Sequence, residues 1–324
     1  MELVVTAPQL LALSPTTLQS SAALRRIAAW GVAAPVAAGI DAALVDALGI
    51  DGLSVAALLA RGAGLVGGGA HWLVADPVSL VAGRDDVVVV ARVDDAEPAF
   101  IARAVALLDA HFAVDGMRVV AVRPGRWLLQ LRDAPRSTFD STDVALGGSM
   151  HAHRPRGQDA RRFERYANEI QMLLHDAPEN DARERAGLPP MNGLWLWDGA
   201  PRVSADVARA GIDAFATDGA AGDLARGIAL ASGGAVRPLG TRLQPSAHDN
   251  ATTLVALPPI TPGSFAQSDA GWLAPATEAL AGRAITRLTL LADGAGTRQW
   301  TVSPPSWQRR LHARFAASRF GVTA

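Results

Sequence analysis

The stretch NEIQMLLHDAPENDARERAGLPPMNGLWLWDGA, residues 168–200, decides the fold of this chain. Its pattern predicts a helix, a break, a short second helix, a turn rich in glycine and proline, and a buried strand. Amide and imidazole side chains stand beside leucines and tryptophans throughout. Such polar groups are costly to bury unless each finds a hydrogen-bond partner. The stretch therefore indicates either a specified polar network or a ligand site.

The helix expected over 159–176 carries three neutral polar side chains on one face, namely Asn168, Gln171 and His175. At 3.6 residues per turn they fall within roughly 60° of one another, beside the apolar stripe that starts at Phe163. One interpretation is recognition of a polar ligand by this face. The other is a hydrogen-bond network that ties the helix to the loop after it, and both stay open.

Residues after this helix are expected to fold back over the same face. The break at Pro178 turns the chain so that Asn180 and Arg183 approach the helix, and residues 187–190 lead into the strand that starts at Asn192. Buried amides in such a turn satisfy backbone groups that an interrupted helix leaves unpaired. Arg183 has the alternative role of a bidentate contact to a phosphate or carboxylate. We expect all six polar side chains to converge.

Apolar runs alternate with amphipathic helices along the rest of the chain. Strands are expected at 71–80, 87–93, 192–197, 211–217 and 252–260, hairpins over 117–132 and 285–302, and helices at 99–112, 222–232 and 268–281. The unbroken valines of 87–93 are typical of a strand that is buried on both faces. This alternation predicts an α/β fold with a mixed sheet flanked by helices.

The length of 324 residues favours two lobes over one. We expect a helical and α/β lobe over residues 1–135 and a second α/β lobe over 161–324, which carries the segment quoted above. Residues 136–160 are rich in Ser, Thr, Asp, Gly and Pro, and we interpret them as a loop or linker between the lobes. Within the first lobe, residues 17–60 are expected to be mainly helical.

Two residue types are missing from the sequence, and their absence excludes several chemistries. The chain has no cysteine, which rules out disulfides, thiolate metal ligands and a cysteine nucleophile. It has no lysine either, so a Schiff-base lysine and a P-loop lysine are excluded. A net charge of −1 gives no general attraction for nucleic acid.

Nothing in the sequence predicts export or a membrane span. The N-terminus lacks a basic region, so we expect no signal peptide and a cytoplasmic location. The most apolar stretch, 31–50, carries Pro35, Asp41 and Asp46. It is therefore expected to form a buried pair of helices rather than a membrane span.

The first predicted strand, 71–80, carries polar residues that have two interpretations. His71 and Asp76, with Arg84 close behind, stand near strand ends, which is where the binding sites of α/β proteins gather. Alternatively, Asp76 caps a turn at Pro77, the residue that is expected to end the strand. All three polar residues are candidates for a site.

Two histidine-containing pairs lie in polar loops. His151 with His153, and His248 with Asp249, offer side chains of the types that bind metals. Isolated pairs of this kind are usually solvated surface, so we expect no metal and no cofactor. The role of both pairs is left open.

The C-terminal stretch 305–319 is expected to form a helix with one apolar stripe and a basic face. Trp307, Leu311 and Phe315 recur every four residues, as in a helix that docks against another surface. Its four arginines are too few for binding to a membrane or to nucleic acid. A protein partner is therefore the candidate for this helix.

Parts of the chain resemble known families. APENDAR (177–183) and GLPPMN (187–192) are similar to the HPVN-x-x-R and GLPPAN motifs of the archaeal-type, cofactor-independent phosphoglycerate mutases of the alkaline-phosphatase-like superfamily. A closer likeness, over nearly the whole chain, is to bacterial RpfE-type regulatory proteins, also described as phosphoglycerate-mutase-like. It rests on HWLVADPV (71–78), RWLLQL (126–131), NEIQMLLH (168–175) and NGLWLWDGA (192–200). The resemblance implies an alkaline-phosphatase-like, mutase-related α/β fold.

The chain departs from the mutase pattern where that family performs its chemistry. Those enzymes hold two divalent metals with Asp and His and use a Ser or Thr nucleophile, but this chain has no Asp-Gly-x-Gly start and no Asp-x-x-x-His pair. The resemblance therefore implies a retained scaffold, and we expect a cytoplasmic regulatory or small-anion-binding protein. The alternative is an active metal-dependent phosphomutase or phosphatase with ligands among Asp76, Asp140, Asp143, His151, His153, His248 and Asp249.

Overall fold

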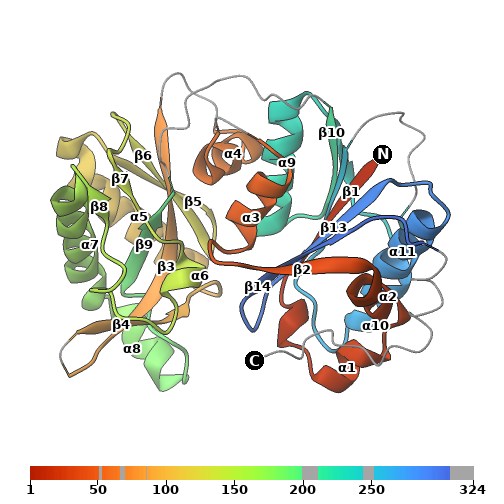
Figure 1. The fold of residues 1–324 in the computed structure, drawn as a ribbon. Coiled ribbons are helices and arrows are strands. Elements are labelled where there is room, and N and C mark those ends of the chain that lie inside the picture. The colour runs from red at the N-terminus through yellow and green to blue at the C-terminus, as the bar shows by residue number, and fades with distance from the viewer. Residues whose placement is uncertain (51–52, 66–69, 85, 199–210, 244–251, 307–324) are drawn as a thin grey trace. The chain divides into compact units, whose positions relative to one another are not determined.

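A computed structural model describes residues 1–50, 53–65, 70–84, 86–198, 211–243 and 252–306. The chain forms two compact units, Met1–Ile50 with Val207–Ala324, and Asp51–Asp206, and each is described by itself. The first unit is built from both ends of the sequence, so its red and blue elements share one sheet in Figure 1. The predicted linker at 136–160 lies inside the second unit.

The sheet of the first unit contains parallel and antiparallel strands, as the sequence predicts. Its order is β11-β10-β12-β1-β13-β14-β2. Strand β1 pairs in parallel with β12 and β13, whereas β14 runs antiparallel to both of its neighbours, β13 and β2. The strands are β1 (Glu2–Ala7), β2 (Gly31–Val36), β10 (Ile212–Ala216), β11 (Val236–Pro238), β12 (Thr252–Ala256), β13 (Arg287–Ala292) and β14 (Thr297–Val302).

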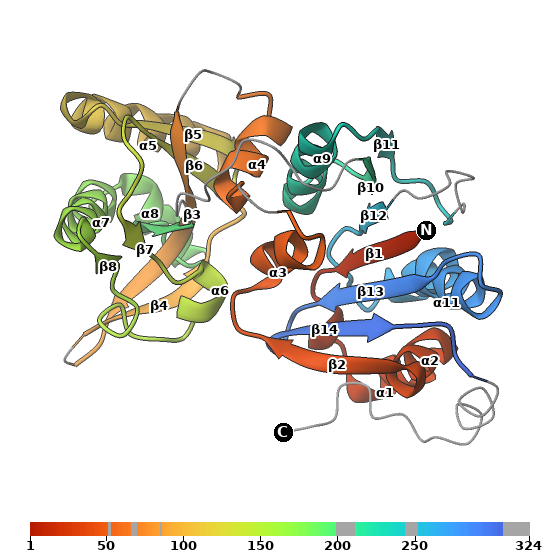
Figure 2. The ribbon, with the colours of Figure 1, turned by 45° about the horizontal axis from the view of Figure 1, so that its top comes forward.

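Helices cover both faces of this sheet. Figures 1 and 2 show α3 and α9 on one side and α2, α10 and α11 on the other. Leu24 and Ile27 of α2 pack with Trp272 and Leu280 against Leu3 of β1, which forms the core of that side. The helices are α1 (Pro15–Ser20), α2 (Ala22–Trp30), α3 (Ile40–Ala47), α9 (Ala220–Ser232), α10 (Phe265–Ser268) and α11 (Ala274–Ala281), with a 3-10 turn at Leu10–Ala12 and a π-helical turn at Asp269–Leu273.

The buried helix pair predicted for 31–50 is wrong in its first half. Gly31–Val36 forms strand β2 at the edge of the sheet, and Val32 is 71% exposed. Pro35 is tolerated there because an edge strand needs donors on one side only. The alanines and valines of this stretch suit a helix as well as a strand, so the hydrophobic pattern alone did not separate the two.

The second unit is an antiparallel sheet centred on a long strand, β3 (His71–Ala82). It pairs with β4 (Val87–Arg92), β6 (Arg126–Leu131) and β9 (Gly193–Trp197), and β5 (Arg118–Arg123) continues the sheet beyond β6. This pairing joins residues on both sides of the predicted linker, which is why no lobe boundary falls at 136–160. A separate small ladder joins β7 (Ser137–Thr138) to β8 (Arg156–Gly157).

Two long helices build the core of the second unit, α5 (Pro98–Phe112) and α7 (Ala160–His175). Phe163 of α7 lies in one buried cluster with Trp127 and Leu194 of the sheet. The shorter helices are α4 (Val55–Gly62), α6 (Thr142–Ala145) and α8 (Pro178–Arg185), with a 3-10 turn at Ala113–Asp115. No helix in the described residues is long and apolar enough to cross a membrane.

The full burial predicted for the valine run is wrong, although the strand itself is confirmed. Val89 is buried, but Val90 of the same strand is 46% exposed. Strand β4 stands at the edge of the sheet, where one face of an antiparallel ladder meets solvent. A continuous apolar run in the sequence therefore does not show that both faces of the strand are buried.

Candidate functional site

Asn180 is the residue that closes the turn after α7. Asn180 belongs to α8, and its side chain is buried. Its Nδ2 donates to the carbonyls of Leu174 at 2.9 Å and of Met191 at 3.2 Å. Its Oδ1 accepts the backbone N–H of Met191 at 2.8 Å. The amide thus holds together the end of α7 and the residues that lead into β9. Of the two roles that the sequence left open, a hydrogen-bond network and ligand recognition, this is the first.

Asn192 extends the pairing between β9 and β3. Its Oδ1 accepts the backbone N–H of Leu80 at 2.7 Å, and its Nδ2 donates to the Leu80 carbonyl at 2.8 Å. The side chain is buried. The side-chain amide therefore takes the place of a backbone hydrogen-bonding pair just before β9 begins. This position lies beside the register shift between Ser79 and Leu80.

Arg183 is almost fully enclosed, with 1% of its side chain exposed. Its Nε donates to the carbonyl of Pro189 at 2.9 Å, and its Nη2 meets Asp95 Oδ1 at 2.5 Å. Its Nη1 lies 3.5 Å from Glu97 Oε2. The guanidinium that the sequence offered to an external anion is thus occupied by carboxylates of the chain itself.

The six polar side chains of this segment do not form one cluster. Asn168 and Gln171 line one cavity, whereas His175 lines a second hollow together with Asn180 and Asn192. Arg183 is directed toward Asp95 and Glu97. Asn180 of α8 contacts α7 at the carbonyl of Leu174, near its C-terminal end, whereas Asn168 and Gln171 lie further back along the helix.

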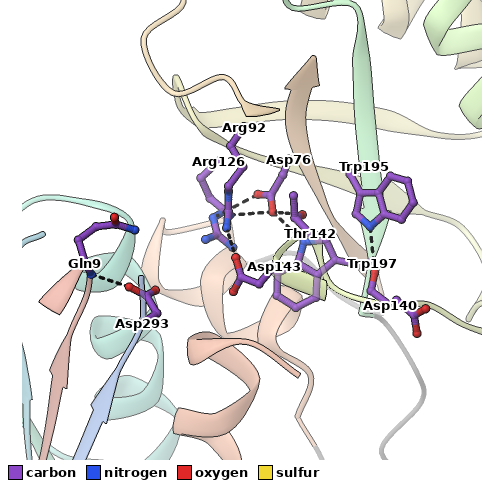
Figure 3. A network of polar contacts seen from close by, with 10 residues as sticks. All are labelled: Gln9, Asp76, Arg92, Arg126, Asp140, Thr142, Asp143, Trp195, Trp197 and Asp293. Carbon is purple, nitrogen blue, oxygen red and sulfur yellow. Dashed lines mark hydrogen bonds and ion pairs between the residues drawn. The ribbon is translucent and has the colours of Figure 1, made fainter. Parts of the chain in front are cut away.

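Asp76 is the centre of a buried charge network, drawn in Figure 3. Its Oδ2 accepts from Thr142 Oγ1 at 2.6 Å and Trp197 Nε1 at 2.8 Å, and pairs with Arg92 at 2.9 Å. Arg126 Nε lies 3.4 Å from Oδ1. Burial alone raises the pKa of Asp76, but Arg126 and Arg92, helped by the two hydrogen bonds, outweigh it and hold the pKa below its usual value.

His71, Asp76 and Arg84 are not brought together. They lie at the start of β3, in its middle and beyond its end, and Pro77, predicted to end the strand, lies inside it and pairs with Leu194. Proline lacks only the N–H donor, and its carbonyl still accepts the backbone N–H of Val93 at 2.9 Å. The candidate role of Asp76 as a turn cap is therefore wrong.

The arginines around Asp76 were not among the candidate residues predicted from the sequence. Arg92 ends the valine strand β4 and also pairs with Asp143 at 2.6 Å, and Arg126 opens the strand β6. A buried aspartate requires charged or hydrogen-bonding partners. An arginine at the boundary of an otherwise apolar strand was the signal that could have identified them.

A cavity of about 210 Å³ lies among α7, β9 and the loop before α7. Phe139 and Phe163 meet edge to face at 5.0 Å in its wall. The remaining lining is buried at β9 and exposed at His151 and Asn168. It comprises Asp86, Val87, Met150, His151, His153, Arg154, Pro155, Glu164, Ala167, Asn168, Gln171, Leu194, Trp195 and Leu196.

One of the two histidine pairs borders this cavity, and its members have different surroundings. His151 is exposed, whereas His153 Nδ1 lies 2.9 Å from Asp140 Oδ2. Asp140 also pairs with Arg156 at 2.6 Å and accepts the indole N–H of Trp195 on its backbone carbonyl at 2.9 Å. The hydrogen bond from Arg156 lowers the pKa of Asp140 most, burial opposes it, and His153 lowers it further.

The His248 and Asp249 pair and the predicted C-terminal helix lie outside the described residues. Among the residues that the structure does describe, no three His, Asp or Glu side chains are grouped so that they could hold a metal ion.

The carboxyl ends of β1 and β13 are joined by a further contact in the first unit. Gln9, whose backbone is left-handed with φ of 61°, donates its N–H to Asp293 Oδ1 at 2.5 Å (Figure 3). Ligands of parallel α/β sheets bind at such strand ends. Here Asp293 instead fixes the strained turn after β1.

No family model matches the sequence. An 89-residue segment, 27% of this chain, is 33% identical to the "Probable 2,3-bisphosphoglycerate-independent phosphoglycerate mutase" of Geobacter sulfurreducens. The match spans only 22% of that relative. It supports the predicted distant resemblance to cofactor-independent phosphoglycerate mutases, whereas the likeness to RpfE-type proteins stays a prediction.

Two solved structures align with most of this chain at low sequence identity. The cofactor-independent phosphoglycerate mutase from Thermoplasma acidophilum superimposes with a TM-score of 0.43 and 17% identity, over 93% of this chain and 89% of that one. The PH0037 protein from Pyrococcus horikoshii gives a TM-score of 0.48 and 12% identity, over 93% and 87% of the two chains.

Proposed function

We propose that this chain is a phosphoglycerate-mutase-like protein that binds a ligand in a regulatory role and does not transfer phosphoryl groups. The observation that carries the proposal is that Asn180, Arg183 and Asn192 are engaged in contacts within the chain. Each is buried, and each directs its polar atoms to the chain's own backbone or carboxylates. Polar groups engaged in this way stabilise the segment and are not available to a substrate without breaking those contacts.

The alternative, a metal-dependent phosphomutase or phosphatase, requires carboxylates that converge on a cation. Two of its candidate ligands already have cationic partners, since Asp76 pairs with Arg92 and Asp140 pairs with Arg156. A divalent metal would have to displace an arginine at either position. This observation favours the binding role over the enzymatic one.

Binding of a small anion at Arg183 is the alternative to this structural role. At Arg183 it would replace Asp95 and Glu97, whose side chains are 50% and 55% exposed and can move into solvent. A cytoplasmic location, the lack of nucleic-acid and membrane partners, and a protein partner at the C-terminal helix remain expectations from the sequence.

The proposal is tested by incubating the purified chain with manganese and zinc before and after chelation. We expect no hydrolysis of p-nitrophenyl phosphate, no interconversion of 2- and 3-phosphoglycerate, and well under one equivalent of metal by elemental mass spectrometry. Asp140→Asn serves as the matched variant. Chelator-sensitive turnover that Asp140→Asn abolishes, with two equivalents of bound metal, would establish the enzymatic alternative.

A further inference from the structure

We infer that the cavity lined by α7 and β9 is a binding site for an uncharged, planar nitrogen heteroaromatic ring of the nucleobase class. The inference rests on the proposed function in one respect, that the chain binds a ligand. The cavity lies entirely within the second unit, because all of its lining residues fall between 86 and 196. Three features of its lining define the ligand.

The first feature is an aromatic wall of suitable size. Phe139 and Phe163 meet edge to face in the lining, which also includes Trp195, Leu194 and Leu196. The volume of about 210 Å³ exceeds the roughly 150 Å³ that holds benzene in an engineered apolar cavity. One aromatic ring or a fused pair fits such a space, and aromatic side chains pack well against a planar ligand.

The second feature is a pair of amides at the rim. Asn168 and Gln171 stand three residues apart on α7, so they lie one above the other on the same face. Neither side chain makes a hydrogen bond within the described part of the chain. Each amide offers a donor and an acceptor, the combination that binds the adjacent donor and acceptor of adenine.

The third feature is the charge of the lining, which favours an uncharged ligand. Arg154 lies 3.9 Å from Glu164, so its charge is directed to a carboxylate of the same rim. Asp86 is held by Ser149 and by the backbone N–H of Val87, which lower its pKa. The carboxylate of Asp86 would repel a phosphate, whereas an uncharged ring meets no such penalty.

The probe that tests the site is adenine, titrated into the full chain by ligand-observed NMR, with toluene and adenosine monophosphate as comparison ligands. We expect saturable binding of adenine and of toluene, and weaker binding of the monophosphate than of adenine. Adenine that fails to bind while toluene binds would show that the ligand class is wrong. Monophosphate binding tenfold tighter than adenine would contradict the charge argument.

Three variants locate the binding. Ala167→Phe fills the cavity and should weaken both adenine and toluene at least tenfold, with a thermal melt to verify folding. Asn168→Leu combined with Gln171→Leu should weaken adenine at least tenfold and leave toluene unchanged. Met172→Leu, at a residue 75% exposed on the same helix, is the matched control and should change neither. Binding that ignores Ala167→Phe in the folded variant would overturn the assignment.

These outcomes are separable from those of the proposed function. Metal-dependent turnover together with adenine binding would reject the regulatory role and keep the cavity. Absence of turnover, with neither adenine nor toluene bound, would reject the cavity as a site and leave the mutase-like, non-enzymatic role standing.

Discussion

Trp197 donates its indole N–H to the carboxylate of Asp76 at 2.8 Å, across 121 residues of sequence. Figure 3 shows the two residues on neighbouring strands. Trp197 is paired in register with Val74. The hydrogen bond joins β9, which ends the segment 168–200, to the long strand β3. The same carboxylate pairs with Arg92 of β4 and Arg126 of β6, so four strands depend on one buried charge.

Replacing Asp76 by asparagine should therefore be severely destabilising. Arg126 would lose its anionic partner and Arg92 one of its two, and breaking a buried ion pair typically costs about 3–5 kcal/mol. Urea denaturation of Asp76→Asn measures the change in free energy of unfolding. Trp197→Phe removes one hydrogen bond to a charged group and should cost less, about 1.5–3 kcal/mol, because Oδ2 keeps Thr142 and Arg92 as partners. Wild-type stability in both variants would show that the network is not structural.

Acid should weaken the fold partly through Asp140. Its pKa is lowered in the folded chain, so its contribution is present above the unfolded pKa of about 3.9 and is lost as pH falls through the folded value. Asp140→Asn should therefore flatten the fall in stability below about pH 5. Urea midpoints measured from pH 3 to 7 check this, and an unchanged slope would contradict the Arg156 and His153 contacts.

Asp269 should behave with the opposite sign. Burial raises its pKa in the folded chain, against the hydrogen bond from Ser21 and the charge of Arg25. A raised pKa means that stability is fully present below the unfolded value and is lost as pH rises through the folded one. Asp269→Asn keeps the acceptor for Ser21 and should raise the urea midpoint at pH 7 relative to wild type. A lower midpoint at that pH would show that the charge is stabilising.

Asn180→Ala should lower the free energy of unfolding by roughly 1–3 kcal/mol, because it leaves the buried N–H of Met191 and two carbonyls without their hydrogen-bond partner. Glu184→Ala, exposed on the same helix, is the matched control and should stay within about 0.5 kcal/mol of wild type. Equal effects of the two substitutions would contradict the structural role of the amide. Both are measured by urea denaturation.

The elements with strong local periodicity were predictable from the sequence. Helices α5 and α7, the β5–β6 hairpin and the strand β9 follow the predicted positions closely, because amphipathic spacing and turn residues specify them locally. Burial was not predictable in the same way. The exposure of Val32 and Val90 depends on which strands stand at sheet edges, a property of the whole topology.

The candidate site was predictable in part for the same reason. The pattern of residues around Asn180 correctly indicated a buried amide that satisfies backbone groups, since all of its partners lie within 11 residues. The partners of Asp76 are distant in sequence, with Thr142 66 residues away. Nothing in the local pattern of β3 specifies which distant side chains contact Asp76. The charge network could therefore be identified only from the structure.

The central claim, that Asn180, Arg183 and Asn192 are architectural, is tested most directly by the thermal unfolding of Arg183→Ala with and without 3-phosphoglycerate. We predict a large fall in melting temperature, equivalent to at least about 2 kcal/mol, because the substitution removes a buried guanidinium that holds Pro189, Asp95 and Glu97. The ligand should not shift the wild-type melt. A variant that melts like wild type but loses a stabilisation by 3-phosphoglycerate seen in wild type would contradict the claim and establish an anion site.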